Sequence, residues 1–253
     1  MTSQLDATSP VAPDSVTLSF REISVSGEEL AAIDFHASLV VLGGYAARDA
    51  VERQNHIDEL RNIGIEAPED VPAFWAVGRH LLTTGGRIEV QGDRTSGEIE
   101  YALLFHEGRV LVAAASDQTD REFEVRSIPR SKQMCAKVLS RRVVALADLL
   151  SGWDDIELYS DVRESDGDWR PYQRTTLTAL MTPDDLIAAC FGERPVPDGT
   201  VLLSGTVSLV DGVTRYWPHF RGGMHLPGSD ADLSVDYAVD VLPDLPYADA
   251  DVR

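Results

Sequence analysis

Two carboxylates spaced two residues apart offer the clearest chemistry in the chain. Glu98 and Glu100 flank Ile99 in the segment GEIEYALLF. Side chains of a strand alternate between its faces, so a strand here places both glutamates on one face. Neighbouring carboxylates repel each other unless a cation or solvent compensates, and an all-oxygen site suits Mg²⁺, Mn²⁺ or Ca²⁺ better than zinc. A solvated acidic strand face is the commoner meaning of this pattern in an acidic chain.

A third acidic residue follows a very apolar segment. Asp117 opens the stretch DQTDRE directly after VLVAAAS. An acid at the end of a buried strand is well placed for a site, because loops at strand ends often carry function. The alternative is a turn in which the aspartate caps the strand end.

His56 and Glu59 form the only candidate acid–base pair that local spacing suggests. They lie three residues apart in a predicted helix over residues 46–63, hence on one face. A carboxylate beside an imidazole can orient the ring and raise its basicity, which makes a general acid–base pair. An exposed, weakly paired helix face is the alternative.

Several common catalytic motifs are missing from the sequence. It contains no G-x-S-x-G, no G-x-x-x-x-G-K-[ST], no H-E-x-x-H and no C-x-x-C. Serine-hydrolase, P-loop nucleotide and zinc-enzyme chemistry therefore have little support.

The elements that must position these residues are mostly strands. Alternation predicts strands within residues 16–44, with a turn at Gly27–Glu29, and further strands at 87–93, 97–105, 108–116, 156–164, 173–181, 200–210 and 232–242. Residues 141–150 predict a short helix or the start of one. Thr182 before Pro183 and two acids predicts a helix that runs to Phe191. The expected fold class is α+β, mostly β, with a few helices packed outside.

Composition limits the partners and the setting. The 253 residues carry 42 acidic and 22 basic side chains, a formal charge of −20. Such a surface repels phosphate backbones and anionic membranes, so we expect neither nucleic acid nor membrane as a partner. Two cysteines form no disulfide framework, and no apolar run approaches the ~20 residues of a membrane span. We expect a cytoplasmic protein.

The domain organisation predicted from the sequence is simple. Residues 1–15 read as a disordered tail, and residues 16–253 as one catalytic domain. Within it, residues 16–85 supply N-terminal strands and a helix, and residues 86–245 a β-rich core.

Taken in order, these motifs resemble the fumarylacetoacetate hydrolase family. GEIEYALLF resembles that family's metal-binding E-x-E strand, and SDQTDRE resembles its NDVSARD segment, whose first Asp is the third metal ligand. SKQMC resembles KSFDTFCP, which carries a substrate-site lysine, here Lys132. DGTVLLSGTV resembles the strand and turn GD-x-I-x-TGTP. NHIDELRNIGIEAPEDVPAF resembles the segment with the catalytic His and Glu, although a second register uses Tyr45 and Arg48-Asp49.

The sequence also departs from the family pattern. Only 16 residues separate Glu100 from Asp117, SGTV replaces TGTP, and Gln133 and Met134 replace Ser-Phe. The chain therefore resembles a divergent branch.

The resemblance implies a fold, an activity and a set of site residues. The fold is a mixed β-sandwich or β-roll with flanking helices, in a homodimer. The activity is that of a hydrolase or lyase dependent on Mg²⁺ or Mn²⁺, with Ca²⁺ as an alternative, which cleaves a C–C bond of a small anionic 2-oxo, acylpyruvate-like acid. A decarboxylase or hydratase with the same metal site, and a non-catalytic binding homologue, are the alternatives. The implied residues are Glu98, Glu100 and Asp117 for the metal, His56, Glu59 and Lys132 for catalysis, and Arg121, Gln133, Ser204, Gly205 and Thr206 for the substrate.

Overall fold

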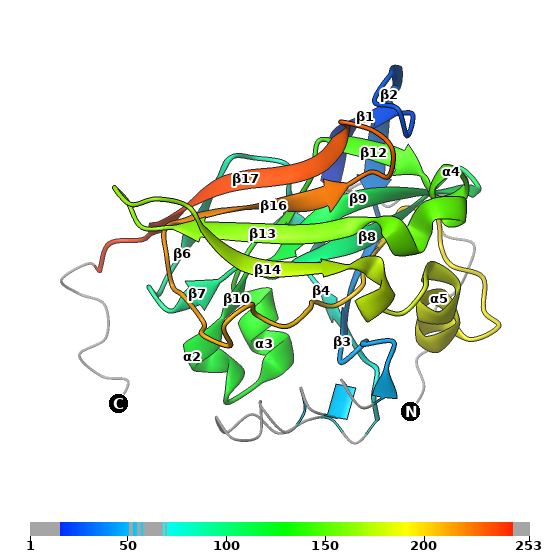
Figure 1. Cartoon of the computed structure of the whole chain (residues 1–253). Helices are drawn as coiled ribbons and strands as arrows, with labels where there is room; N and C mark the ends of the chain where they lie inside the picture. Colours follow the sequence, from blue (N-terminus) through cyan, green and yellow to red (C-terminus); the bar gives the residue numbers. More distant parts are fainter. Residues whose placement is uncertain (1–15, 51–52, 55–56, 58–67, 69, 245–253) are drawn as a thin grey trace.

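The computed structural model describes residues 16–50, 53–54, 57, 68 and 70–244. Its largest element is a ten-stranded sheet with the path β2-β1-β12-β9-β8-β15-β3-β4, in which β11 also pairs with β9, and β5 with β11 (Figure 1). These strands are β1 (Val16–Ile23), β2 (Glu29–Ala37), β3 (Leu39–Gly44), β4 (Ala73–Val77), β5 (Leu82–Thr83), β8 (Ile99–His106), β9 (Arg109–Asp117), β11 (Lys137–Leu139), β12 (Arg142–Ala145) and β15 (Thr200–Leu203).

A five-stranded sheet, β14-β13-β16-β17-β6, lies against the central strands of the first sheet. Its strands are β6 (Arg87–Val90), β13 (Glu157–Arg163), β14 (Arg170–Thr176), β16 (His219–His225) and β17 (Asp232–Val241), and a small ribbon pairs β7 (Thr95–Ser96) with β10 (Thr119–Asp120). The helices are α2 (Arg121–Glu124), α3 (Ile128–Gln133), α4 (Leu146–Leu149) and α5 (Pro183–Phe191), with 3₁₀ turns at Arg79–Leu81, Leu150–Asp155 and Leu177–Ala179. Helices α2 and α3 lie together at one end of the sheets, and α5 at the other (Figure 1).

Strands β8 and β9 are buried on both faces, which accounts for their nearly continuous apolar sequence. Ile99, Tyr101 and Leu103 pack into the core between the two sheets, where Phe220 and Tyr237 meet them. The alternate residues of β8 and β9 pack into a second core against β1, β2 and β3. The carboxylate segment therefore sits at the end of the best-buried hairpin of the molecule, where neighbouring backbone is held firmly.

Several expected elements are confirmed, and with them the mostly β, α+β fold class. The turn between β1 and β2 contains Gly27 with a φ of 87°, a conformation that glycine adopts without a steric penalty. Helix α5 begins where expected, because the Thr182 side chain accepts a hydrogen bond from the Asp185 N–H.

Other expectations need correction. Residues 46–49 are not helical, because Ala47 forms a β-bridge with Leu180. Within the described part of the predicted helix, helical structure is found only at Ala50 and at positions 53, 54 and 57. The rest of the predicted helix lies outside the described residues. The segment 141–150 is strand β12 followed by α4, since Val143 and Val144 each enter one of the two cores. The strand predicted over 200–210 ends at Leu203. Helices α2 and α3 were not predicted.

Two further expectations cannot be compared with this structure. The predicted tail over residues 1–15 lies outside the described residues, and the single-domain organisation stays a prediction. Within the described part of the chain, no helix is long and apolar enough to cross a membrane.

Candidate metal centre

The site is assembled from one row of residues across three strands. The Asp117 N–H donates to the Glu98 carbonyl at 2.9 Å, and Lys137 on β11 is the direct partner of Asp117 on β9. Directly paired residues of antiparallel strands share a face. Glu98, Asp117 and Lys137 therefore line up on one face, and Glu100, two residues along, joins them there.

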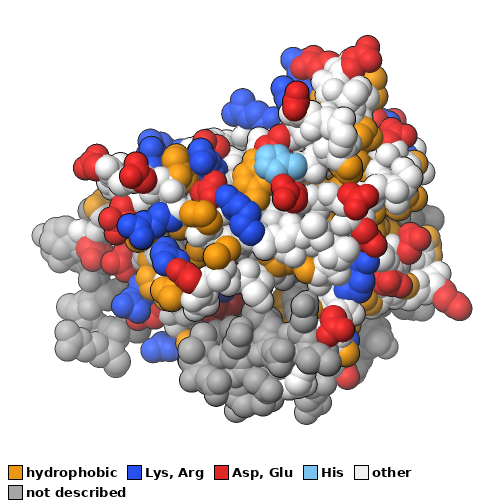
Figure 2. Space-filling model, in the orientation of Figure 1, with side chains coloured by type: hydrophobic (Ala, Val, Ile, Leu, Met, Phe, Trp, Pro, Cys, Tyr) orange, Lys and Arg blue, Asp and Glu red, His pale blue; other side chains and the backbone are white. Residues whose placement is uncertain are grey.

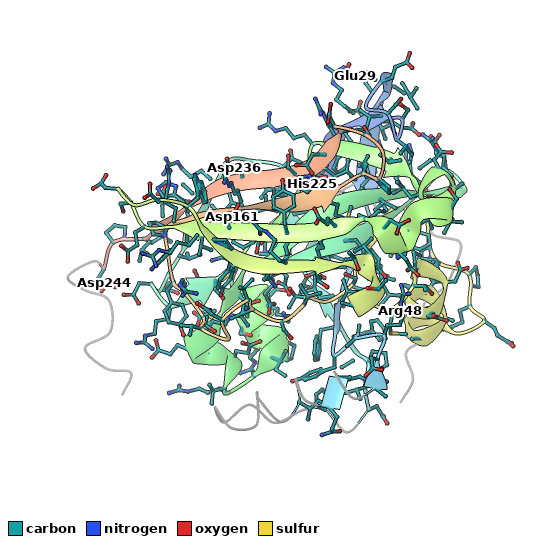
Figure 3. All side chains as sticks on the ribbon, in the orientation of Figure 1. Glu29, Arg48, Asp161, His225, Asp236 and Asp244 are labelled. Carbon is teal, nitrogen blue, oxygen red and sulfur yellow. The ribbon has the colours of Figure 1, made fainter. Side chains whose placement is uncertain are left out.

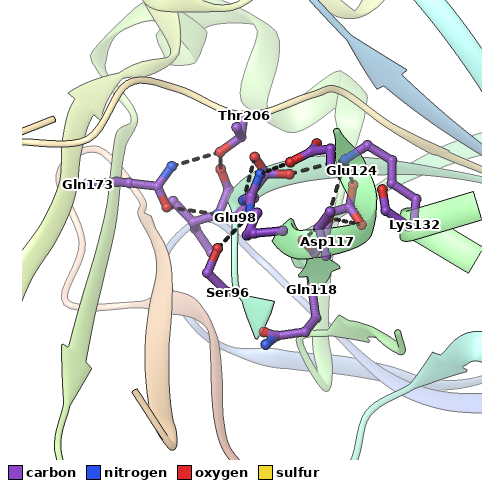
Figure 4. A network of polar contacts seen from close by, with 12 residues as sticks. Ser96, Glu98, Asp117, Gln118, Glu124, Lys132, Gln173 and Thr206 are labelled. Atoms are coloured by element: carbon purple, nitrogen blue, oxygen red, sulfur yellow. Dashed lines mark hydrogen bonds and ion pairs between the residues drawn. The ribbon is translucent and has the colours of Figure 1, made fainter. Parts of the chain in front are cut away.

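Basic side chains join these carboxylates (Figure 4). The Lys132 Nζ lies 2.5 Å from Asp117 Oδ2 and 3.1 Å from Glu98 Oε2, so one ammonium bridges both groups. Arg121 binds the other Glu98 oxygen at 2.9 Å, and Lys137 binds Asp117 Oδ1 at 2.7 Å. Every oxygen of Glu98 and Asp117 thus has a cationic partner.

The electrostatic surroundings shift the pKa values of Glu98 and Glu100 in opposite directions. Burial opposes ionisation of Glu98, but Arg121 and Lys132 more than offset it and lower its pKa to about 2. Burial and the charge of Asp117 raise the pKa of Glu100 well above its ordinary value. Glu100 is 1% exposed, accepts a hydrogen bond from the Gly205 N–H, and has no ion-pair partner among the described residues.

This donor set fits a hard divalent cation in the kind of ligand atom it offers. Three carboxylates supply only oxygen, which Mg²⁺ and Mn²⁺ prefer. Glu100 is a buried acid without an ion-pair partner among the described residues, and its raised pKa disfavours the ionised form, so a cation beside it would favour the carboxylate. In the side-chain positions described, however, no three His, Cys, Asp or Glu residues stand in a metal-binding arrangement. Lys132 instead bridges Glu98 and Asp117.

The residues expected to bind substrate divide into two groups. Arg121 reaches the cluster, and Gly205 reaches it through its N–H group, which holds Glu100. Thr206 donates to the Ile99 carbonyl at 2.9 Å, so it anchors the carboxylate strand. Ser204 is buried and donates to the Gly205 carbonyl.

Gln133 lies elsewhere. It is exposed, and its amide oxygen accepts a hydrogen bond from the Gly78 N–H at 2.8 Å. The structure does not bring it to the carboxylates.

Three residues of the site were missed by the sequence analysis. Glu124 on α2 binds Arg121 at 2.9 Å, and Lys137 holds Asp117. Gln173 accepts from the Ile99 N–H at 3.0 Å and donates to Thr206 at 2.7 Å. Lys137 and Gln173 contact segments that are distant in the chain, so local spacing carries no signal for them, whereas Glu124 and Arg121 lie three residues apart in α2, a helix that was not predicted.

Tyr45 feels the charges of the cluster. It is 9% exposed and follows β3 with a φ of 56°, a conformation uncommon for a residue other than glycine. Burial raises the pKa of its phenol to about 12, with Glu124 and Glu98 adding to the effect and Lys132 opposing it.

The predicted acid–base pair, His56 and Glu59, lies outside the described residues. Arg48, which belongs to the alternative register, is described and points away from the carboxylates. It binds Asp154 at 2.8 Å beside α5 (Figure 3).

The fold is similar to that of proteins with solved structures. A crystal structure of Cg1458 gives a TM-score of 0.60 at 13% identity, covering 89% of this chain and 89% of that chain. A 2-keto-3-deoxy-D-arabinonate dehydratase, solved in apo form and complexed with magnesium and 2,5-dioxopentanoate, gives 0.60 at 13% identity, covering 86% of this chain and 84% of that chain. At such low identity the similarity shows a shared fold.

The family is shown by sequence. Residues 43–237 match the family described as "Protein of unknown function (DUF2848)", and because this match spans most of the chain, the protein belongs to that family. The search of curated proteins found no significant match. The resemblance to the fumarylacetoacetate hydrolase family itself stays a prediction.

Proposed function

We propose that this protein is an enzyme that uses Mg²⁺ or Mn²⁺ to act on a small 2-oxo carboxylic acid, as a lyase or hydrolase. The observation that carries the proposal is Glu100, a buried carboxylate without a cationic partner among the described residues, beside Glu98 and Asp117. Burial disfavours the ionised form of this carboxyl and raises its pKa, and raised pKa values of this kind cluster at functional sites. The fold supports the proposal, since a protein of similar fold was solved with magnesium and 2,5-dioxopentanoate.

The side chains around the carboxylates suit an anionic substrate. A divalent cation bound by Glu98, Glu100 and Asp117 would supply Lewis-acid polarisation of the substrate's 2-oxo acid group. Arg121 and Lys132 are the cations placed to pair with a substrate carboxylate or with negative charge that develops on its oxygen. His56 and Glu59 are proposed to move the proton, with Glu59 orienting the imidazole.

The proposal includes two candidates for the bond that breaks in the substrate. Cleavage of a C–C bond in an acylpyruvate-like acid is what the resemblance to the fumarylacetoacetate hydrolase family implies. Dehydration is the second candidate, because the similar fold of a 2-keto-3-deoxy-D-arabinonate dehydratase favours it. Assays of acylpyruvates, oxaloacetate and 2-keto-3-deoxy acids with product analysis separate cleavage, decarboxylation and dehydration. Loss of turnover in His56→Asn, with metal binding retained, would support the acid–base assignment.

The decisive test is metal binding by calorimetry on chelator-stripped protein, with Mg²⁺ and Mn²⁺ titrated with and without oxalate. We expect saturable binding that oxalate strengthens, and loss of that binding in Glu100→Gln. Asp161→Asn is the matched control, because Asp161 is a buried carboxylate held by Arg174 and Arg221 on the outer sheet (Figure 3). Binding that survives Glu100→Gln, or no binding by the wild type, would overturn the proposal.

Figure 2 shows acidic and basic side chains interspersed over the five-stranded sheet, with no large region of one sign. We propose, from the family resemblance, that the enzyme is a cytoplasmic homodimer, and light scattering coupled to gel filtration checks its mass.

A further inference from the structure

The chain uses lysine only at this site. Of its 22 basic residues, 20 are arginines, and the two lysines are Lys132 and Lys137. Both contact Asp117, one at each carboxylate oxygen. An ammonium is a compact point charge on a flexible stem, whereas a guanidinium is a rigid planar fork. The concentration of both ammonium groups on one aspartate therefore indicates a role that arginine does not fill.

The two lysines are anchored differently. Lys137 lies in β11, which pairs with β5 on one side and β9 on the other, and the residue has no exposed surface. Its Nζ donates to the Gln118 backbone carbonyl as well as to Asp117, each at 2.7 Å. If the Lys137 ammonium moved away from Asp117, it would stay buried without its carboxylate partner, which is costly. The pairing of β11 with strands on both sides holds Lys137 in place.

Lys132 is held only by other side chains. It extends from the short helix α3, and its partners are Glu98, Asp117 and, at 3.4 Å, the Thr119 hydroxyl. No backbone carbonyl contributes to these contacts among the described residues. Four rotatable bonds allow this ammonium to swing away while α3 stays in place.

Lys132 and a bound cation compete for the same charge. The ammonium spans Glu98 and Asp117, two of the three carboxylates proposed as metal ligands, whereas Lys137 approaches Asp117 from the neighbouring strand. Two cations held between the same pair of carboxylates repel each other strongly where water is scarce.

We propose that the two lysines divide the neutralisation of Asp117: Lys137 is its permanent counter-ion, and Lys132 is an exchangeable one that leaves Glu98 and Asp117 when a divalent cation binds. This inference rests on the proposed function and deepens it. The released ammonium stays beside the site, where it is free to pair with the carboxylate of an anionic substrate. The position of the Lys132 ammonium thus depends on metal binding, and Lys137 is a positioning residue that holds Asp117.

Amine labelling of the intact wild-type protein tests the exchange directly, because the sequence has only two lysine side chains and each is followed in its own peptide. The protein is pulsed with acetic anhydride with and without saturating Mn²⁺, whose binding is followed by electron paramagnetic resonance, and modified peptides are quantified by mass spectrometry. We expect Mn²⁺ to speed acetylation of Lys132 by about tenfold or more, since charge-assisted hydrogen bonds are released, while Lys137 stays protected. Unchanged or slower labelling of Lys132 in Mn²⁺-loaded protein would overturn the proposal.

Matched variants distinguish exchange from a general charge effect. Lys132→Met should bind Mn²⁺ about tenfold or more tightly than the wild type, because the competitor is gone. Lys137→Met removes the same charge from the same aspartate but should give no such gain, because Asp117 loses its anchor. Equal gains in Mn²⁺ affinity in both variants would indicate a general electrostatic effect and would contradict the division of roles between Lys132 and Lys137.

Different outcomes would refute the proposed function and the exchange of Lys132. If the wild type binds Mn²⁺ and Lys132→Met binds it no more tightly, the exchange alone is wrong. If neither protein binds Mn²⁺, the metal-dependent function falls and the exchange falls with it.

Discussion

Lys137 lies directly opposite Asp117 in the β9–β11 pair, with its Nζ 2.7 Å from Oδ1 and no surface exposed to solvent. Breaking a buried ion pair by removing one partner leaves the other charge desolvated, which typically costs about 3–5 kcal/mol. We expect Lys137→Met to lower the free energy of unfolding by about 2–4 kcal/mol, somewhat less because Lys132 still neutralises Asp117. Urea denaturation measures the change.

A double-mutant cycle isolates this pair. Lys137→Met combined with Asp117→Asn should lose less stability than the two single changes added together, because no charge is then left unpaired. Strict additivity would show that the contact contributes nothing beyond packing.

Gln173 joins the two sheets beneath the carboxylates. It accepts hydrogen bonds from Ile99 N–H and the Ser160 hydroxyl and donates to Thr206 and to the Val207 carbonyl. Gln173→Leu leaves these buried groups unpaired, so we expect a loss of about 2–4 kcal/mol in unfolding free energy.

The same substitution at an exposed glutamine provides the comparison. Gln133→Leu removes one hydrogen bond at the surface and should change the free energy of unfolding by less than about 1 kcal/mol. Similar losses at positions 133 and 173 would contradict the role assigned to the buried network.

Acid should weaken the site through Glu98. Its folded-state pKa of about 2 lies below the ordinary value of 4.5, so the carboxylate adds stability that is complete above pH 4.5 and disappears as the pH falls toward 2. Glu98→Gln lacks this contribution. The stability gap between wild type and variant, measured by urea denaturation, should therefore shrink across that interval. A gap that stays constant down to pH 2 would refute the assignment.

Both thiols should be unreactive in the folded protein. Burial raises the pKa of Cys135 to about 12 and that of Cys190 to about 11, so little thiolate exists at pH 8. We expect slow alkylation by iodoacetamide in buffer and fast alkylation in guanidinium chloride, followed by intact-mass spectrometry. Fast modification of Cys135 in buffer would be inconsistent with its buried position.

Much of the local structure was predictable because it depends on near neighbours. Alternating polar and apolar residues predicted β1 and β2, and Thr182 before Pro183 predicted the start of α5. The helix expected from residue 46 failed at its beginning because a distant partner, Leu180, holds Ala47 in a β-bridge. Propensity yields to tertiary contacts when the segment gains backbone hydrogen bonds elsewhere.

In the candidate centre, too, some features depend on near neighbours in the sequence and others on tertiary contacts. The sequence by itself determined that Glu98 and Glu100 share a strand face, because side chains alternate along any strand. Only the tertiary structure decided that Asp117 and Lys137 complete that row, since strand register depends on which segments pair. It also decided that Lys132 spans two carboxylates while Glu100, within the described part of the chain, receives only a backbone N–H from a residue 105 positions away. Charge compensation in a buried site depends on distances through space, and residue spacing along the chain does not encode them.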